Sequence, residues 1–187
     1  MPRPSLRSVF LWNLLLSSLV LANDKPKPAA VQTPKPAPAL VDAFKVMTGT
    51  WACKGKFKKP DGTDSDGSST MVITSELDGF TYSGAYQVPK SEMLPAGMQG
   101  QLFWSYDSAN RRLVEFFADS LGAIGHGTSE GLKGDTVVWE EDEVLMGQPK
   151  KVRTTVKRLS PTEMSLTFDT PGSGTWVNMG SNTCKKQ

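Results

Sequence analysis

Hydrophobic and polar residues alternate in short runs along most of the chain after Thr48. In the run 80–88, Phe80, Tyr82 and Tyr86 share one face, and polar residues occupy most positions between them. Because the side chains of a strand point alternately to its two faces, this pattern predicts half-buried strands rich in β-branched and aromatic residues. The ten predicted strands are 50–57, 69–77, 80–88, 99–107, 112–119, 123–131, 135–143, 150–159, 163–170 and 174–185.

The connections between these runs carry turn residues such as Asp78-Gly79 and Lys133-Gly134-Asp135. Such sequences favour tight hairpins, and none of the connections is long enough for a crossover helix. Consecutive antiparallel strands form a meander, which avoids exposed edges most simply by pairing its last strand with its first. The sequence therefore predicts an all-β fold, an antiparallel up-and-down barrel of about ten strands.

A short helix is predicted before the first strand, because Leu40, Val41, Phe44 and Met47 recur at helical spacing. Gly49 is expected to end this helix, which would close one end of the barrel.

The first 22 residues have the pattern of a signal peptide, with Arg3 and Arg7 before an apolar run and a cleavage site after Ala22. A membrane anchor is the alternative, but the apolar run is shorter than the roughly 20 residues of a spanning helix and is interrupted by Asn13. Residues 23–39 are rich in proline and form a predicted disordered linker. We therefore expect a periplasmic or secreted barrel domain over residues 40–187, with no transmembrane segment in the mature protein.

Charge argues against a nucleic-acid partner. Loss of Arg3 and Arg7 would leave 19 basic residues against 19 acidic ones, and no dense run of Lys and Arg remains. A protein that captures phosphates needs a positive surface, so nucleic-acid binding is not expected.

Cys53 and Cys184 are the two cysteines of the chain. An exported pair usually forms a disulfide, and their wide separation does not fit a zinc or redox motif. They lie at the start of the first predicted strand and the end of the last, which an even-stranded barrel brings side by side. We expect a Cys53–Cys184 disulfide.

Gly49-Thr-Trp51 resembles the Gly-x-Trp signature that opens lipocalins and other calycin barrels. Further segments are similar to the secreted bacterial family catalogued as domain of unknown function 1579. They are 47–53, 104–107, 117–122, 127–131, 134–139, 153–156, 174–176 and 183–186. Ser105 and Leu132 depart from the family pattern. The resemblance implies an exported calycin-like barrel and supplies no activity.

The single histidine, His126, is the residue on which any histidine-dependent chemistry would rely. Nitrobindin-like barrels bind haem through a histidine near the C-terminus, and the last predicted strand here has none. Haem ligation through His126 is kept as an alternative to the expectation of no cofactor. The alternative interpretation is that His126 is a structural strand residue at a close-packed position between Gly125 and Gly127.

No catalytic or metal site is expected. The acidic loop 61–67 lacks the leading Asp and closing Glu of a calcium loop, and the run Glu140–Glu143 is expected to be solvated. No Gly-x-Ser-x-Gly motif or Walker lysine is present in the sequence.

The interior is the remaining candidate site, and we expect it to bind a small apolar or amphipathic ligand. The candidate cavity residues are Trp51, Tyr82, Tyr86, Trp104, His126, Trp139, Phe168 and Trp176. The connection 89–98 carries soft apolar residues that suit a lid over an opening. A non-catalytic structural or interaction barrel with a filled core, in contact with the cell envelope, is the alternative.

Overall fold

The computed structural model describes residues 33–59, 61–92, 94–145 and 147–187. The predicted signal peptide and most of the predicted linker lie outside these residues. The strands are β1 (Gly49–Lys58), β2 (Asp64–Glu76), β3 (Thr81–Val88), β4 (Met98–Asp107), β5 (Arg112–Asp119), β6 (Ile124–Ser129), β7 (Leu132–Lys133), β8 (Thr136–Leu145), β9 (Gln148–Ser160), β10 (Glu163–Pro171) and β11 (Trp176–Lys186).

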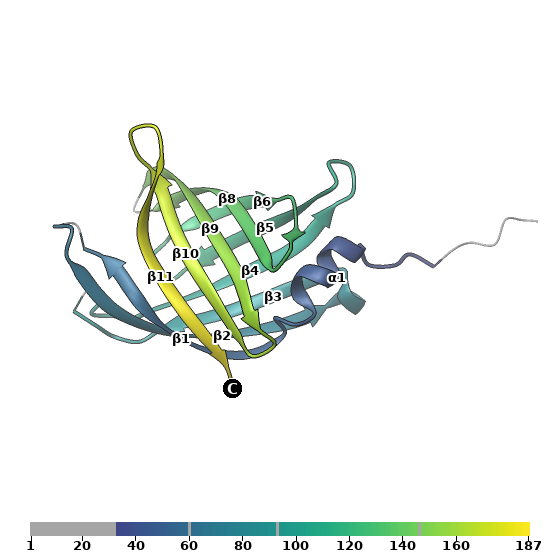
Figure 1. Ribbon diagram of the computed structural model, residues 1–187, viewed down its shortest axis with the longest axis horizontal. Helices are drawn as coiled ribbons and strands as arrows, with labels where there is room; N and C mark the ends of the chain where they lie inside the picture. Colours follow the sequence, from purple (N-terminus) through teal and green to yellow (C-terminus); the bar gives the residue numbers. More distant parts are fainter. Residues whose placement is uncertain (1–32, 60, 93, 146) are drawn as a thin grey trace, which may run out of the picture. The chain divides into compact units, whose positions relative to one another are not determined.

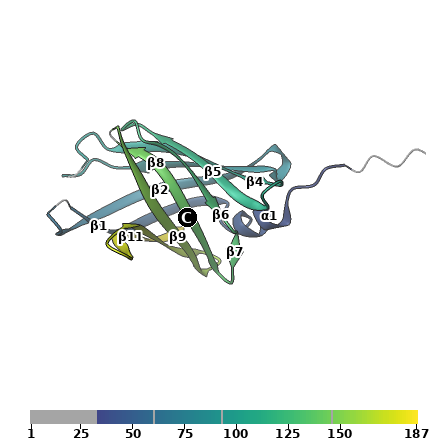
Figure 2. The ribbon, with the colours of Figure 1, turned by 90° about the horizontal axis from the view of Figure 1, so that it is seen from above.

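Ten of these strands form a closed antiparallel barrel. The hydrogen-bonded order runs from β6 back to β1, continues through β11 to β8, and closes by direct pairing of β6 with β8. The two-residue strand β7 pairs only with β8, outside the ring. Figures 1 and 2 show the strands curling around a common interior. The all-β, ten-stranded barrel is therefore confirmed.

The strand β2 begins five residues earlier than predicted, at Asp64 instead of 69. Polar residues of the acidic segment 61–67 pair with β1, with Asp64 opposite Lys58 and Asp66 opposite Lys56. An ion pair of 2.6 Å joins the side chains of Lys58 and Asp64. Opposite charges on facing strands support pairing, so the hairpin of β1 and β2 continues where a loop was expected.

The short helix α1 (Pro38–Phe44) lies at one end of the barrel (Figure 1). Its buried residues are Leu40, Ala43 and Phe44, at the spacing of one helical face. The helix begins at a proline, whose fixed φ suits the first turn, and ends before the predicted Met47. Met47 is nevertheless buried with the helix in the core.

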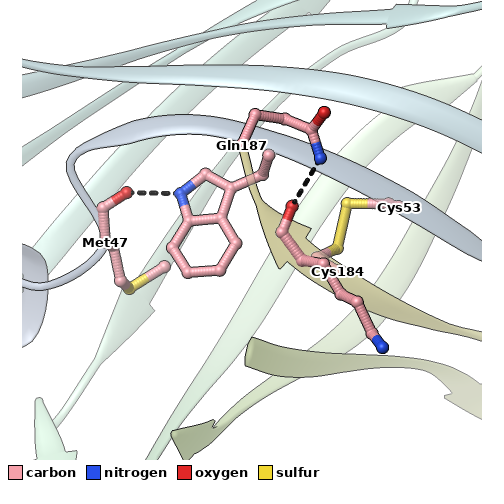
Figure 3. The surroundings of a disulfide bond; sticks show 6 residues. Met47, Cys53, Cys184 and Gln187 are labelled. Atoms are coloured by element: carbon pink, nitrogen blue, oxygen red, sulfur yellow. Dashed lines mark hydrogen bonds between the residues drawn. A yellow bond between two sulfur atoms is a disulfide. The ribbon is translucent and has the colours of Figure 1, made fainter. Parts of the chain in front are cut away.

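A disulfide joins Cys53 of β1 to Cys184 of β11, as predicted (Figure 3). The two residues are direct partners in the strand register. Both are buried, and Trp51 beside them donates a 2.7 Å hydrogen bond from Nε1 to the carbonyl of Met47. The tryptophan joins the first strand to the turn that follows the helix, and the disulfide joins it to the last strand.

None of the helices in the described ranges is long and apolar enough to cross a membrane.

An interior cavity and a buried carboxyl pair

Aromatic rings fill the end of the barrel beneath α1. The ring of Phe44 stacks on Tyr82 at 5.0 Å between centroids and lies 4.8 Å from Trp104 and 6.4 Å from Trp139. All four side chains are buried, and Trp51 belongs to the same core cluster. The four predicted residues Trp51, Tyr82, Trp104 and Trp139 are thus brought together.

A cavity of about 60 Å³ remains between α1 and the strands. Its lining is almost wholly apolar and includes Trp104, Trp139 and the three methionines Met47, Met71 and Met164. Pockets for drug-sized molecules are about 300 Å³ or more, so this cavity fits only a small group as it stands. Flexible methionine side chains can shift to enlarge it.

The acidic residue in the lining is Glu115 of β5. Its side chain is buried, with 4% of the residue exposed. Oε2 accepts a 2.8 Å hydrogen bond from Nε1 of Trp104. Oε1 accepts from no N–H or hydroxyl group of the described residues and has the carboxyl group of Glu141 as its polar neighbour. A buried polar atom without a partner costs about 1 to 3 kcal/mol. Oε1 of Glu115 therefore needs a donor, which either a proton shared with a neighbouring carboxyl group or a polar group of a ligand can supply.

A second carboxyl group, that of Glu141 on β8, lies beside Glu115. In the register Glu115 is opposite Gly127 of β6, and Gly127 is opposite Glu141. A Cβ atom at Gly127 would lie 2.5 Å from Oε1 of Glu115 and 2.9 Å from Cγ of Glu141. The glycine therefore lets the two acidic side chains meet over its backbone.

Burial raises the pKa of Glu115 well above its usual range, and the neighbouring Glu141 adds to the effect. Burial also raises the pKa of Glu141 to about 7, although hydrogen bonding to Thr154 and Glu115 opposes part of the change. A carboxylate in an apolar surrounding is disfavoured, and two adjacent charges are disfavoured further. Near neutral pH the pair therefore holds at least one proton for much of the time.

More acidic groups continue from this pair along the interior face. Glu143 follows Glu141 by two residues on β8, and Asp119 follows Glu115 by four on β5, so each shares a face with its partner. Burial raises the pKa of Glu143. Burial and the neighbouring Asp119 raise the pKa of Tyr86, which places this predicted residue in the same acidic part of the barrel.

Phe168 is half-buried and stacks on Phe57 at 5.8 Å between centroids, apart from the cavity. It contributes to a second aromatic contact inside the barrel and does not line the cavity.

The structure does not bring His126 to the interior. The inward positions of β6 are its neighbours Gly125 and Gly127, whose Cβ atoms would meet Phe117 and Glu115. His126 alternates with them, is exposed, and is opposite the exposed Phe116. Its position therefore gives no support to haem ligation inside the barrel.

Trp176 is also directed away from the cavity. The pairing of β10 with β11 shifts between Phe168 and Asp169, because Met179 is an extra residue in β11. Such a bulge reverses the alternation beyond it. Trp176 then stacks against Arg153 at 4.7 Å, and Arg153 alternates along β9 with Thr154, which lines the cavity.

Sequence reasoning missed Glu115 and Glu141, because charged residues are expected on solvated faces. A signal was present in both strands. Glu115 stands between Leu113 and Phe117 in an alternating apolar series, and Glu141 follows Trp139 by two residues. Each acid occupies the same alternate positions of its strand as the apolar residues, which indicates that its side chain points into the barrel.

A second hollow, of about 850 Å³, lies between strands β1 and β2 and the connection from β3 to β4. Its lining is mixed and includes Lys54, Ser68, Gln87, Lys90 and Met98. The connection that was expected to act as a lid therefore borders this hollow. It does not line the apolar cavity under α1.

No protein-family model and no curated protein sequence matches the chain. Membership of the domain of unknown function 1579 family is thus not confirmed.

Solved structures that resemble this one are found at low sequence identity. Rv2717c from Mycobacterium tuberculosis has a TM-score of 0.60 at 15% identity, over 82% of this chain and 99% of that one. The S-type phycobiliprotein lyase CPES from Guillardia theta has a TM-score of 0.50 at 12% identity, over 78% and 91%. A redesigned β-barrel, b11L5F_LGL, has a TM-score of 0.41 at 19% identity, over 78% and 95%. The likeness to the first two shows the barrel fold and nothing finer.

Proposed function

We propose that this protein is an exported, non-catalytic barrel that binds a small, mainly apolar molecule in its interior beside Glu115. The observation that supports this most directly is the buried Glu115 in the lining of an apolar cavity, whose Oε1 accepts from no N–H or hydroxyl group of the described residues. A ligand with one polar group would satisfy that oxygen and place its apolar part among the methionines. The disulfide suits an oxidising compartment and agrees with export.

Binding of 1-butanol to the purified mature protein tests this proposal. Trp104 and Trp139 line the cavity, so their fluorescence is the readout. Val137→Leu adds volume to the lining, and Val138→Leu is the matched control on the exposed side of the same strand. We expect a saturable change that weakens roughly tenfold in Val137→Leu, a difference of about 1.4 kcal/mol, and is unchanged in Val138→Leu. A fluorescence response without saturation, or equal responses in both variants, would contradict an interior site.

A filled-core interaction barrel remains the second candidate, because the cavity is small and the outer face carries exposed aromatic residues. Phe103 and Phe116 are direct partners on β4 and β5, and are 54% and 58% exposed. An apolar patch of this kind is a candidate protein contact. This candidate predicts that Phe116→Ser reduces co-sedimentation with the cell-envelope fraction, and an unchanged distribution would count against it.

A further inference from the structure

No basic residue of the described ranges lines the cavity beside the interior acidic groups. Glu115 is the single charged residue among the cavity-lining side chains, and Glu141 contacts it. The four salt bridges between described residues involve none of Glu115, Asp119, Glu141 and Glu143. Lys150 is the basic residue that acts on Glu143. Among the described residues, the Glu115–Glu141 pair therefore has no basic partner.

The charge of a ligand decides whether it can bind beside such a carboxyl pair. Without a partner, the carboxyls stay protonated, because a buried carboxylate is strongly disfavoured unless it is paired. An anionic ligand would be repelled by any ionised member of the pair. A cation would replace the proton that the pair shares, stabilise the ionised form and donate a charge-assisted hydrogen bond to Oε1 of Glu115.

A metal ion does not fit this pair. The described residues contain no group of three or more His, Cys, Asp or Glu side chains placed to hold one. The remaining lining is apolar and rich in methionine, which suits the hydrocarbon part of an organic cation.

We propose that the interior ligand is a small amine in its protonated form, with its ammonium group between Glu115 and Glu141 and its hydrocarbon part in the methionine-lined cavity. This inference rests on the proposed function and specifies its ligand class. Glu143 and Asp119 extend the negative potential along the interior and favour approach of the same charge.

Binding of the amine should depend on pH through the carboxyl pair. Glu115 faces Glu141 from β8, Trp104 from β4 and the backbone of Gly127 from β6. The cavity-lining residues of α1 have no titratable side chain. Because the pKa of Glu141 is raised to about 7, the pair gains charge as the pH rises through 7, and affinity for an ammonium group rises with it. The pKa of Glu143, raised by burial, belongs to the same interior.

The test compares three probes that share one hydrocarbon chain: butylammonium, 1-butanol and butyrate, measured by calorimetry at pH 8 and pH 5. At pH 8 we expect butylammonium to bind at least tenfold more tightly than 1-butanol, and butyrate not to bind. The preference should shrink at pH 5. Glu141→Gln and Glu115→Gln should remove it, while Glu140→Gln, the exposed neighbour on β8, should retain it.

The outcomes separate the two proposals. If 1-butanol binds as tightly as butylammonium at pH 8, the ammonium ligand is wrong and the interior site stands. If the preference persists in Glu141→Gln, the ammonium group is bound elsewhere and the inference fails. If none of the three probes binds, the interior site itself fails. Should Glu115→Gln not fold, Glu141→Gln alone decides the matter.

Discussion

At the scale of single residues, glycines on one strand lie opposite large side chains on the next around the barrel interior. Gly84 makes room for the ring of Trp104, whose nearest atom would lie 2.6 Å from an added Cβ, and Gly127 makes room for Glu115. Small residues opposite large ones are typical of small filled barrels. The two carboxyl groups can therefore meet because Gly127 of β6 has no side chain.

A first prediction concerns Gly127→Ala. The added methyl group should displace Glu115 and Glu141 and lower the free energy of unfolding by about 1 to 3 kcal/mol, the usual cost of overpacking. Urea denaturation measures this. In a Glu115→Ala background the penalty should shrink, because one of the two contacted side chains is gone. Equal penalties in both backgrounds would show that Glu115 does not occupy this space.

A second prediction follows from the raised pKa of Glu141. Its folded-state pKa of about 7 exceeds the ordinary value of 4.5, so the folded protein binds this proton more tightly than the unfolded chain does. The stability contribution is complete below about pH 4.5 and is lost as the pH rises through 7. Glu141→Gln should therefore raise the free energy of unfolding at pH 8 by about 2 to 3 kcal/mol and change it little at pH 5.

The control is Glu140→Gln on the exposed face of β8. It should leave the pH dependence of unfolding as it is in the unmodified protein. A pH profile in which Glu141→Gln parallels the unmodified protein would mean that Glu141 is not a buried acid.

The candidate site was only partly predictable at this scale. Aromatic residues such as Trp104 and Trp139 were assigned to the interior because large apolar side chains are seldom solvated. Glu115 was not, since the same rule assigns acids to the outside. Only the pairing of β5, β6 and β8 reveals that two acids flank one glycine.

At the scale of elements, α1 is held in the barrel by specific hydrogen bonds. Arg158 of β9 donates from Nη2 to the carbonyls of Asp42 and Ala43, the latter at 2.8 Å. Lys186 of β11 donates from Nζ to the carbonyl of Val46 at 3.2 Å. Both side chains contact carbonyls near the C-terminal end of the helix, which favours positive charge. The helix therefore covers the cavity, and these hydrogen bonds hold it and the turn after it against β9 and β11.

The third prediction tests this attachment with Arg158→Met, which preserves length and removes the donors. Backbone amides of α1 should exchange hydrogen faster, and the free energy of unfolding should fall by about 1 to 2 kcal/mol. Lys157→Met, at an exposed neighbouring position on β9, is the control and should change neither quantity. Unchanged exchange in Arg158→Met would contradict the anchoring role of this residue.

Most element boundaries could be predicted because alternation is a local property. The strand β5 was predicted over 112–119, as observed. The early start of β2 was missed, since its pairing with β1 depends on charges of the partner strand at Lys56 and Lys58. The bulge in β11 was also missed, and with it the outward direction of Trp176. Bulges depend on the partner strand and have no strong local signature.

For the whole molecule, the Cys53–Cys184 disulfide joins the first and last strands of the ring. The closed loop spans nearly the complete barrel, and in the chain-entropy model its removal costs about 5 kcal/mol. The overall fold could be predicted because tight turns, consecutive pairing and this cysteine pair all indicate one closed meander.

The fourth prediction is that Cys53→Ser with Cys184→Ser lowers the free energy of unfolding by about 3 to 5 kcal/mol. Thermal and urea unfolding under identical conditions measure the loss. Reducing agent should lower the stability of the unmodified protein and leave the double variant unaffected. Equal stability of the two proteins would mean that the disulfide does not form in solution.

The central claim is that a ligand binds inside the barrel beside Glu115, and a crystal structure with butylammonium at pH 8 tests it most directly. The account predicts electron density for the probe in the cavity beneath α1, with its nitrogen within hydrogen-bonding distance of Oε1 of Glu115. A crystal in which the cavity stays empty while butylammonium occupies the hollow beside Lys54 and Lys90 would contradict it.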